Sequence, residues 1–302
     1  MDLSVAIGEL TLDNPVLTAS GTFGYGLEYD GHFDVAELGG ICTKGLSLLP
    51  RHGNAPARIW ETAAGMLNAI GLANVGVEAF CTDKLPTLRE RGVTVIPNIF
   101  ATSVEDFRKL AERLEGEEGI AALELNVSCP NVDHGGLQFG VDPQACAEVT
   151  KAGWEVASRP VWVKMAAEAG DLAAVGVACQ EAGAQALTAI NTIRGLAIDI
   201  RTRRARIANR TGGLSGPALK PIAIRMVWEL SRAVDIPIIG IGGVATWQDV
   251  VEYLLAGASA VQVGTASFAD PLAAKKALDG LRVHCEEQGL TPRQLVGALD
   301  EG

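Results

Sequence analysis

The chain has 302 residues, a length that suits one α/β barrel with insertions and is enough to bury a large core. Hydrophobic residues make up 48% of it, which excludes a disordered or fibrous protein. The net charge of −11 argues against a general nucleic-acid binder, because such proteins usually carry a basic face.

Neither a membrane anchor nor an export signal is expected from the sequence. No stretch reaches the roughly 18 apolar residues of a membrane-spanning helix, and the start "MDLSVAIGEL" lacks a basic leader region. The six cysteines are scattered, without a C-x-x-C pair or a Cys/His cluster. We therefore expect a cytoplasmic chain with free thiols, no metal site and no iron–sulfur cluster of its own.

The first elements in chain order are strands. Residues 3–16 alternate apolar and polar side chains on both sides of Gly8, which predicts an N-terminal β-hairpin. Eight short apolar runs follow, rich in Val, Ile, Leu and Ala and with little strict alternation, as in strands that are buried on both faces. They are residues 15–20, 39–45, 93–99, 121–127, 161–165, 186–191, 236–242 and 260–265.

Helical patterns separate most of these runs. One begins with a capping box of Ser103 and Asp106, and another with Thr246 and Asp249. Eight βα units predict a (β/α)8 TIM barrel, with an open doubly wound sheet as the alternative. We predict a single domain, residues 1–302. The long connections 46–75 and 192–216 are interpreted as lids or binding loops over the C-terminal face.

Polar residues stand at the ends of the predicted strands, where the catalytic groups of such barrels lie. They are Ser20, Lys44, Asn98, Asn126, Lys164, Asn191, the pair Gly242/Gly243 and the pair Gly264/Thr265. Strand ends are also simply where polarity begins, but that does not explain two lysines that each end an apolar strand. A lysine at a barrel mouth needs an anionic partner or a shifted pKa.

Two glycine-containing strand ends predict a phosphate site. "GIGGVAT" (240–246) matches the G-x-G-x-x-A fingerprint of dinucleotide sites, but no acidic residue ends a following strand to hold a ribose. The loops after strands 7 and 8 of a barrel commonly bind one phosphate, unless their glycines serve only tight turns. Asparagine carboxamides suit a flat ring with donors and acceptors. Phosphate, ring and lysine together indicate flavin mononucleotide (FMN).

Cys129 lies in "NVSCPN", just past the fourth strand, where Pro130 holds it on a turn. A thiolate there can serve as a base or a nucleophile. His134 is near it in sequence, so a Cys–His pair stays open. The other five cysteines are expected to be spectators. The basic run 201–210 is interpreted as a solvated lid face rather than a nucleic-acid contact.

Several long motifs resemble the catalytic subunit of dihydroorotate dehydrogenase, most closely the NAD-linked class 1B. They include "ASGTFGYG", "ELNVSCPNV", "GGLSGPALKPIAIR" and "AVQVGTASF", and the resemblance covers nearly the whole chain. The cysteine of "SCPN" separates class 1 from the membrane-associated class 2, which uses serine. Two stretches depart from the family pattern, "MAAEAGDL" after Lys164 and "IFA" after Asn98, so the loops after strands 3 and 5 are expected to differ locally.

The resemblance implies a role for each matching residue in the oxidation of dihydroorotate to orotate, a step of pyrimidine biosynthesis. Cys129 would be the base that takes a proton from C5, hydride would pass from C6 to flavin N5, and Lys44 would contact flavin and substrate. FMN would be held by Ser20, Lys44, Gly45, Asn98, Asn126, Lys164, Ile190, Gly216, Gly242, Gly243, Gly264 and Thr265. The substrate would be bound by Lys44, Asn68, Ala69, Ile70, Gly71, Leu72, Asn126, Asn191 and Thr192.

The resemblance also implies partners. Class 1B enzymes pair this chain with a subunit that carries FAD and a [2Fe–2S] cluster and reduces NAD, around a homodimer core. Three alternatives stay open from sequence: a class 1A-like enzyme that uses fumarate, a lysine Schiff-base lyase that uses Lys164 or Lys44, and a flavin- or phosphate-binding subunit without catalysis.

Overall fold

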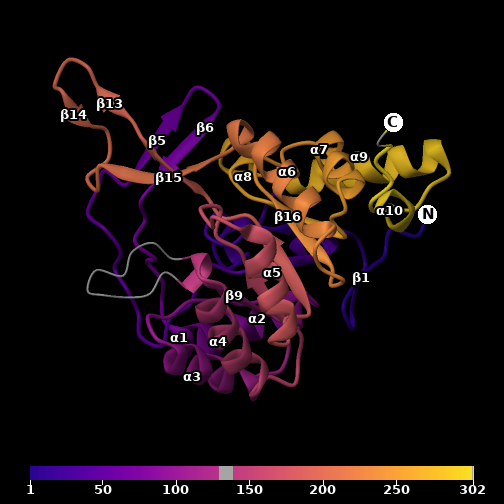
Figure 1. The fold of residues 1–302 in the computed structure, drawn as a ribbon, viewed down its shortest axis with the longest axis horizontal. Coiled ribbons are helices and arrows are strands. Elements are labelled where there is room, and N and C mark those ends of the chain that lie inside the picture. Colours follow the sequence, from indigo (N-terminus) through magenta and orange to yellow (C-terminus); the bar gives the residue numbers. More distant parts are fainter. Residues whose placement is uncertain (129–138, 301) are drawn as a thin grey trace.

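A computed structural model describes residues 1–128, 139–300 and 302. Its centre is a closed barrel of parallel strands, and each of the eight predicted runs contributes to it (Figure 1). The barrel strands are β3 (Val16–Thr18), β4 (Gly40–Cys42), β7 (Val95–Ile96), β8 (Asn98–Ile99), β9 (Leu123–Asn126), β10 (Val161–Lys164), β11 (Ala186–Ala189), β16 (Ile238–Ile241) and β17 (Ala260–Val263). The predicted (β/α)8 barrel is confirmed.

The third barrel strand decides between a closed barrel and an open sheet. Pro97 interrupts it because proline has no backbone N–H, and leaves two halves, β7 and β8. β7 pairs with β4, while β8 pairs with β9. The two halves thus join the opposite ends of the strand order β7-β4-β3-β17-β16-β11-β10-β9-β8, and the doubly wound alternative is wrong.

Helices surround the barrel. They are α1 (Val77–Asp83), α2 (Leu85–Glu90), α3 (Val104–Glu115), α4 (Pro143–Trp154), α5 (Leu172–Glu181), α6 (Lys220–Ser231), α7 (Trp247–Leu255), α8 (Ala266–Ala269), α9 (Ala273–Gln288) and α10 (Pro292–Leu295), with 3-10 turns η1 (Leu27–Tyr29), η2 (Val35–Glu37), η3 (Phe139–Val141) and η4 (Pro217–Leu219). No helix in the described ranges has the length and apolarity to cross a membrane.

The predicted helix starts are present. Ser103 accepts a hydrogen bond from the Asp106 backbone N–H at 3.1 Å, so the first half of that capping box is formed. At Thr246 the box is complete, because Asp249 also accepts from the Thr246 backbone N–H at 2.8 Å.

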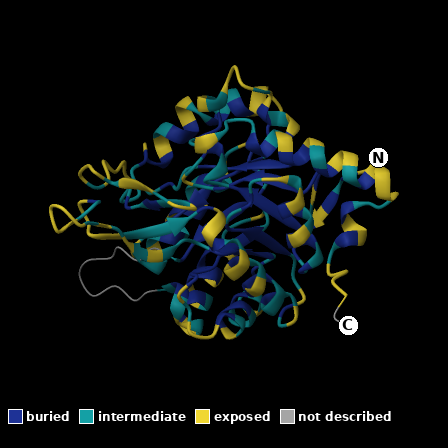
Figure 2. Cartoon of the chain, turned by 90° about the horizontal axis from the view of Figure 1, so that it is seen from above, coloured by how far each residue is buried: buried dark blue, intermediate teal, exposed yellow. Residues whose placement is uncertain are grey.

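The N-terminal hairpin closes one end of the barrel. Strands β1 (Val5–Ile7) and β2 (Leu10–Leu12) turn at Gly8, whose φ of 62° favours glycine. Three hairpin side chains, Val5, Ile7 and Leu12, form one buried cluster with a side chain from each of the eight predicted runs. These are Leu17, Cys42, Ile96, Ala122, Trp162, Ala186, Ile239 and Ala260. The hairpin prediction is confirmed, and only the C-terminal end of the barrel remains for polar chemistry. Figure 2 shows the buried strands at the centre.

The two long connections contain strands, which the sequence analysis did not predict. They form a four-stranded antiparallel sheet in the order β12-β15-β6-β5, from β5 (Ile59–Thr62), β6 (Gly65–Asn68), β12 (Ile193–Leu196) and β15 (Thr211–Ser215). β15 pairs with β6 across a gap of 145 residues in sequence, so no local pattern could reveal the pairing. Both connections lie over the C-terminal face and line the cavity there, as predicted, but the strands within them were not predicted.

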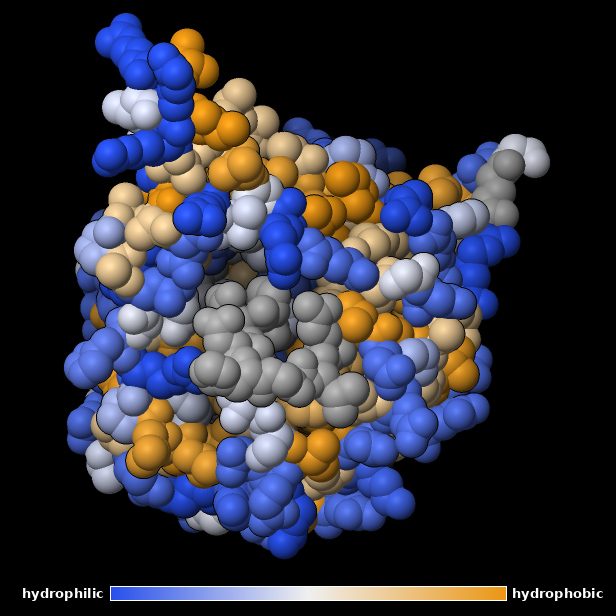
Figure 3. All heavy atoms as spheres, turned by 60° about the vertical axis from the view of Figure 1, so that its left-hand side comes forward, coloured by the Kyte–Doolittle hydropathy of each residue, from blue (hydrophilic) through white to orange (hydrophobic). Residues whose placement is uncertain are grey.

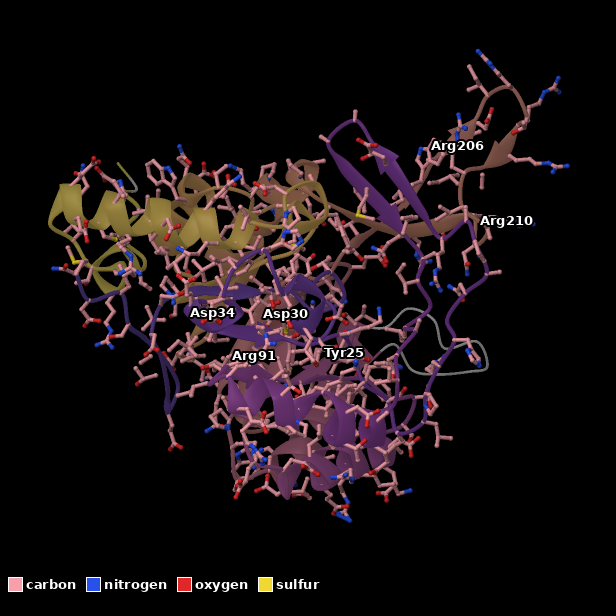
Figure 4. All side chains as sticks on the ribbon, turned by 180° about the vertical axis from the view of Figure 1, so that it is seen from behind. Tyr25, Asp30, Asp34, Arg91, Arg206 and Arg210 are labelled. Atoms are coloured by element: carbon pink, nitrogen blue, oxygen red, sulfur yellow. The ribbon has the colours of Figure 1, made fainter. Side chains whose placement is uncertain are left out.

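A projecting hairpin, which we call the arm (residues 194–210), extends from this sheet and carries β13 (Ile198–Asp199) and β14 (Arg204–Ala205). Leu196, Ile198 and Ile200 are exposed on it beside several arginines, so hydrophobic and hydrophilic groups lie side by side there (Figure 3). The Arg206 guanidinium lies 4.4 Å from the ring centre of Trp60. Figure 4 labels Arg206 on the arm. The basic run is largely exposed, as predicted, although it is part of a hairpin.

One apolar residue in the sealed barrel end and one on the arm give a direct test of this architecture. Ile239→Ala leaves a cavity among fully buried side chains, so we expect it to lower the free energy of unfolding by about 2 to 5 kcal/mol. The matched control is Ile200→Ala, since Ile200 is 86% exposed, and its effect should stay within about 0.5 kcal/mol. Urea unfolding measures both, and equal effects would contradict the packing described.

Candidate functional site

A cavity of about 440 Å³ opens at the C-terminal end of the barrel, between the strand ends and the antiparallel sheet. It gathers every predicted ligand-binding residue: Ser20, Lys44, Gly45, Asn68, Ala69, Ile70, Gly71, Leu72, Asn98, Asn126, Lys164, Ile190, Asn191, Thr192, Gly216, Gly242, Gly243, Gly264 and Thr265. Cys129 and His134 lie outside the described residues. The cavity brings the predicted residues together, while the role of each toward a ligand stays a prediction.

Lys164 is a buried cation at the bottom of the cavity. It is only 3% exposed, and its Nζ donates to Ser20 Oγ at 3.0 Å. It forms no salt bridge with a carboxylate in the described ranges. Because a buried charge needs compensation, this lysine favours a ligand with an anionic or electron-rich group.

Lys44 follows β4 and is half-buried in the same cavity. Burial lowers its pKa from the ordinary 10.5, and the positive charge of Arg58 lowers it further, against an opposing effect of Glu28. The site therefore holds two different lysines: one that is deeply buried and one whose charge is lost at a lower pH than usual.

An amide cluster lines the wall of the cavity after β9 and β11. Ser128 Oγ donates to Asn126 Oδ1 at 2.8 Å, and Asn191 Nδ2 approaches the same oxygen at 3.4 Å. Asn191 Nδ2 also donates to Ser128 Oγ. On the antiparallel sheet, Asn68 Nδ2 donates to the Gly213 carbonyl at 3.2 Å. Such a set presents donors and acceptors to a flat polar ring.

The glycine loop after β16 lets the backbone approach the cavity closely. Gly242 and Gly243 have φ values of 137° and 72°, and a Cβ on Gly243 would lie 2.8 Å from the Gly216 carbonyl oxygen. The Tyr253 hydroxyl donates to the Gly242 carbonyl at 2.6 Å and holds the loop. The capped start of α7 follows directly. This arrangement fits a phosphate group beside the loop.

The sequence analysis missed several residues. Ser128, Glu168, Arg194 and Ser215 line the cavity, and Glu168 Oε1 accepts from the Arg194 backbone N–H at 3.1 Å. Glu168 belongs to the "MAAEAGDL" stretch that departs from the family pattern. Arg194 and Ser215 lie on β12 and β15, so only the unpredicted sheet places them here.

Glu124 on β9 was also missed, although it is fully buried beneath the cavity. Its carboxylate accepts hydrogen bonds from Asn98 Nδ2 at 2.7 Å, Thr188 Oγ1 at 2.8 Å and Gln262 Nε2 at 2.7 Å. The signal was present: in "LELN" an acidic residue stands two positions before Asn126, and so on the same face of the strand.

The family of the chain follows from comparison with known proteins. A family model described as dihydroorotate dehydrogenase matches residues 2–284. The chain belongs to the dihydroorotate dehydrogenase family. Family membership makes the chain an oxidoreductase, as predicted, and leaves the Schiff-base lyase without support.

Curated relatives match the chain over almost its full length. Proteins of Geotalea uraniireducens and Geobacter sulfurreducens are 50% and 51% identical to it, over 99% of this chain and 98% of their own lengths. A protein of Pelobacter propionicus is 49% identical over 99% of both chains. All three are named dihydroorotate dehydrogenase B (NAD(+)), catalytic subunit, which is the class that the sequence motifs resemble.

Proposed function

We propose that the chain is the catalytic subunit of an NAD-linked dihydroorotate dehydrogenase, which oxidises dihydroorotate to orotate in pyrimidine biosynthesis. The observation that carries this function is a single cavity lined by Lys44, Lys164 and the asparagine set in a chain of this family. The relatives named for NAD favour this class over the fumarate-using alternative.

We propose that residues 1–302 form one FMN-binding domain. The unpaired Lys164, the glycine loop after β16 and the buried, unpartnered Asn98 Oδ1 fit the electron-rich ring and the phosphate of FMN. The residues that would hold FMN are those of the sequence analysis, from Ser20 and Lys44 to Gly264 and Thr265. When bound, the flavin ring supplies the acceptor for a hydride.

We propose that substrate binds between the flavin and the antiparallel sheet. Residues 68–72, Asn126, Asn191 and Thr192 would bind the orotate ring and carboxylate, and Lys44 would contact both the flavin and the substrate. Cys129 would remove the proton from C5. Its place in the sequence, three residues after the cavity-lining Asn126, supports this role.

Replacing the proposed base tests the reaction. The wild-type chain with FMN should be yellow and lose its flavin absorbance when dihydroorotate is added without oxygen. Cys129→Ala should keep FMN but slow this flavin reduction by about 10² to 10⁴-fold, since general base catalysis contributes that much. Stopped-flow absorbance at the flavin band measures the rate.

The matched control is Cys285→Ala, which removes a buried thiol of α9 and should leave the rate unchanged. Reduction of Cys129→Ala at the wild-type rate would show that another group is the base. A chain that takes up no FMN would refute the proposed function as a whole.

The lowered pKa of Lys44 predicts how orotate binding changes with pH. The ammonium attracts the orotate carboxylate, so its contribution is complete below the pKa of Lys44 and is lost as the pH rises through it. Because burial and Arg58 lower this pKa from 10.5, the loss should begin at a lower pH than for an ordinary lysine. We expect orotate affinity to fall about tenfold or more as the pH rises through the pKa of Lys44.

Lys44→Arg provides the comparison, because a guanidinium stays protonated throughout this range. Titration of the flavin spectrum with orotate at each pH gives the dissociation constants. If orotate affinity falls equally at high pH in wild type and in Lys44→Arg, a group other than Lys44 causes the fall.

We propose two protein partners: a second copy of this chain in a homodimer core, and a subunit that carries FAD and a [2Fe–2S] cluster and passes electrons to NAD. The relatives named as catalytic subunits support the second partner. The exposed apolar side chains of the arm support a protein contact there. The free, buried thiols of Cys42, Cys81, Cys146, Cys179 and Cys285 support our proposal of a reducing, cytoplasmic compartment.

Purification of the untagged protein from its own cells tests these partners. We expect an assembly with two copies of this chain and an iron–sulfur flavoprotein, identified by mass spectrometry and light scattering. Recovery of an active, monomeric chain without another subunit would contradict both partners.

A further inference from the structure

We propose that Glu124 is a positioning residue: its carboxylate turns the Asn98 amide so that Oδ1 faces the cavity and accepts the ring N–H of the flavin. This inference rests on the proposed FMN function and concerns the specificity of that site. Glu124 itself does not line the cavity, whereas Asn98 does.

The orientation of the Asn98 amide follows from the chemistry of its partner. An ionised carboxylate can only accept hydrogen bonds. Oε1 of Glu124 receives Asn98 Nδ2, and Oε2 receives both Thr188 Oγ1 and Gln262 Nε2. Turning the Asn98 amide would place its oxygen against the carboxylate, two acceptors with no proton between them, so the observed orientation is held.

This orientation leaves the Asn98 oxygen for a ligand. Asn98 is 1% exposed, and its Oδ1 has no hydrogen-bond partner among the described residues. A Cβ on Gly45 would lie 3.0 Å from this oxygen, so glycine at that position leaves space beside it. A buried acceptor without a partner costs free energy, which a donor on the ligand would recover.

The flavin ring has one group of the required kind. Oxidised isoalloxazine carries a single ring N–H, at N3, and its other polar ring atoms are acceptors. Asn98 Oδ1, held in place by Glu124, is an acceptor and therefore selects this N–H. The amide turned the other way would present a donor and would favour a different ring.

Glu124→Gln tests the proposal because it should reverse the Asn98 amide. The oxygen of Gln is best placed where two donors converge, from Thr188 and Gln262, which leaves its NH₂ opposite Asn98 alone. Asn98 then turns to accept, and presents its own NH₂ to the cavity. We expect the dissociation constant of FMN from the reconstituted full chain to rise about tenfold.

The measured quantity is the ratio of the dissociation constants of FMN and 3-methyl-FMN, which lacks the N–H at N3. Flavin fluorescence gives both constants. Wild type should prefer FMN, and Glu124→Gln should lose most of this preference. Thr188→Val is the matched control: it removes another donor to the same carboxylate, so it should lower stability but keep the preference. In an Asn98→Ala background, Glu124→Gln should have no further effect on FMN affinity.

Each other outcome is decisive. A wild-type preference in Glu124→Gln, or an equal loss in Thr188→Val, would overturn the positioning role while leaving the FMN function intact. A loss of FMN affinity that persists without Asn98 would show that Glu124 acts through its charge, and would overturn the proposal as well. A wild-type chain that binds neither flavin would refute the proposed function and this inference together.

Discussion

The closure of the barrel at one end fixes where polar side chains can lie. The N-terminal hairpin and a layer of apolar side chains fill the N-terminal end of the barrel, so polar groups on the inner face find space only toward the other end. The pleat of a strand puts every second side chain on this inner face. On β9, Glu124 and Asn126 come after the apolar layer in the direction of the C-terminal end of the barrel. Glu124 is fully buried, whereas Asn126 lines the cavity.

The polar layer beneath the cavity must balance charge without water. Lys164 and Glu124 are nearly or fully buried, and no salt bridge joins them. Among the described residues Lys164 donates only to Ser20, whereas Glu124 accepts from three neutral side chains. Lys164 also lines the cavity, so a ligand there can reach it. Burial in this layer also raises the pKa of the Cys42 thiol, which is consistent with an inert cysteine there.

The second wall of the cavity comes from outside the barrel repeat. Strands β6 and β15, from two distant connections, pair with each other and face the strand ends, so they supply Asn68 and the segment after it. The wall includes residues with no counterpart in a minimal barrel, such as Arg194 and Ser215. Specificity for a ligand can therefore vary with these strands while the barrel keeps its form.

The barrel, its hairpin, its helix starts and most of the cavity lining could be predicted from the amino-acid sequence. Apolar runs, capping residues and strand-end polarity are local patterns, and the side chains at the C-terminal ends of a parallel barrel necessarily converge. The long motifs identified the family. The folded structure reveals the strands within residues 46–75 and 192–216, because their pairing joins residues 145 positions apart. It also decided which way the Asn98 amide points, since that depends on the carboxylate of Glu124 on the neighbouring strand, and hydrogen-bond geometry across strands leaves no trace in either local sequence.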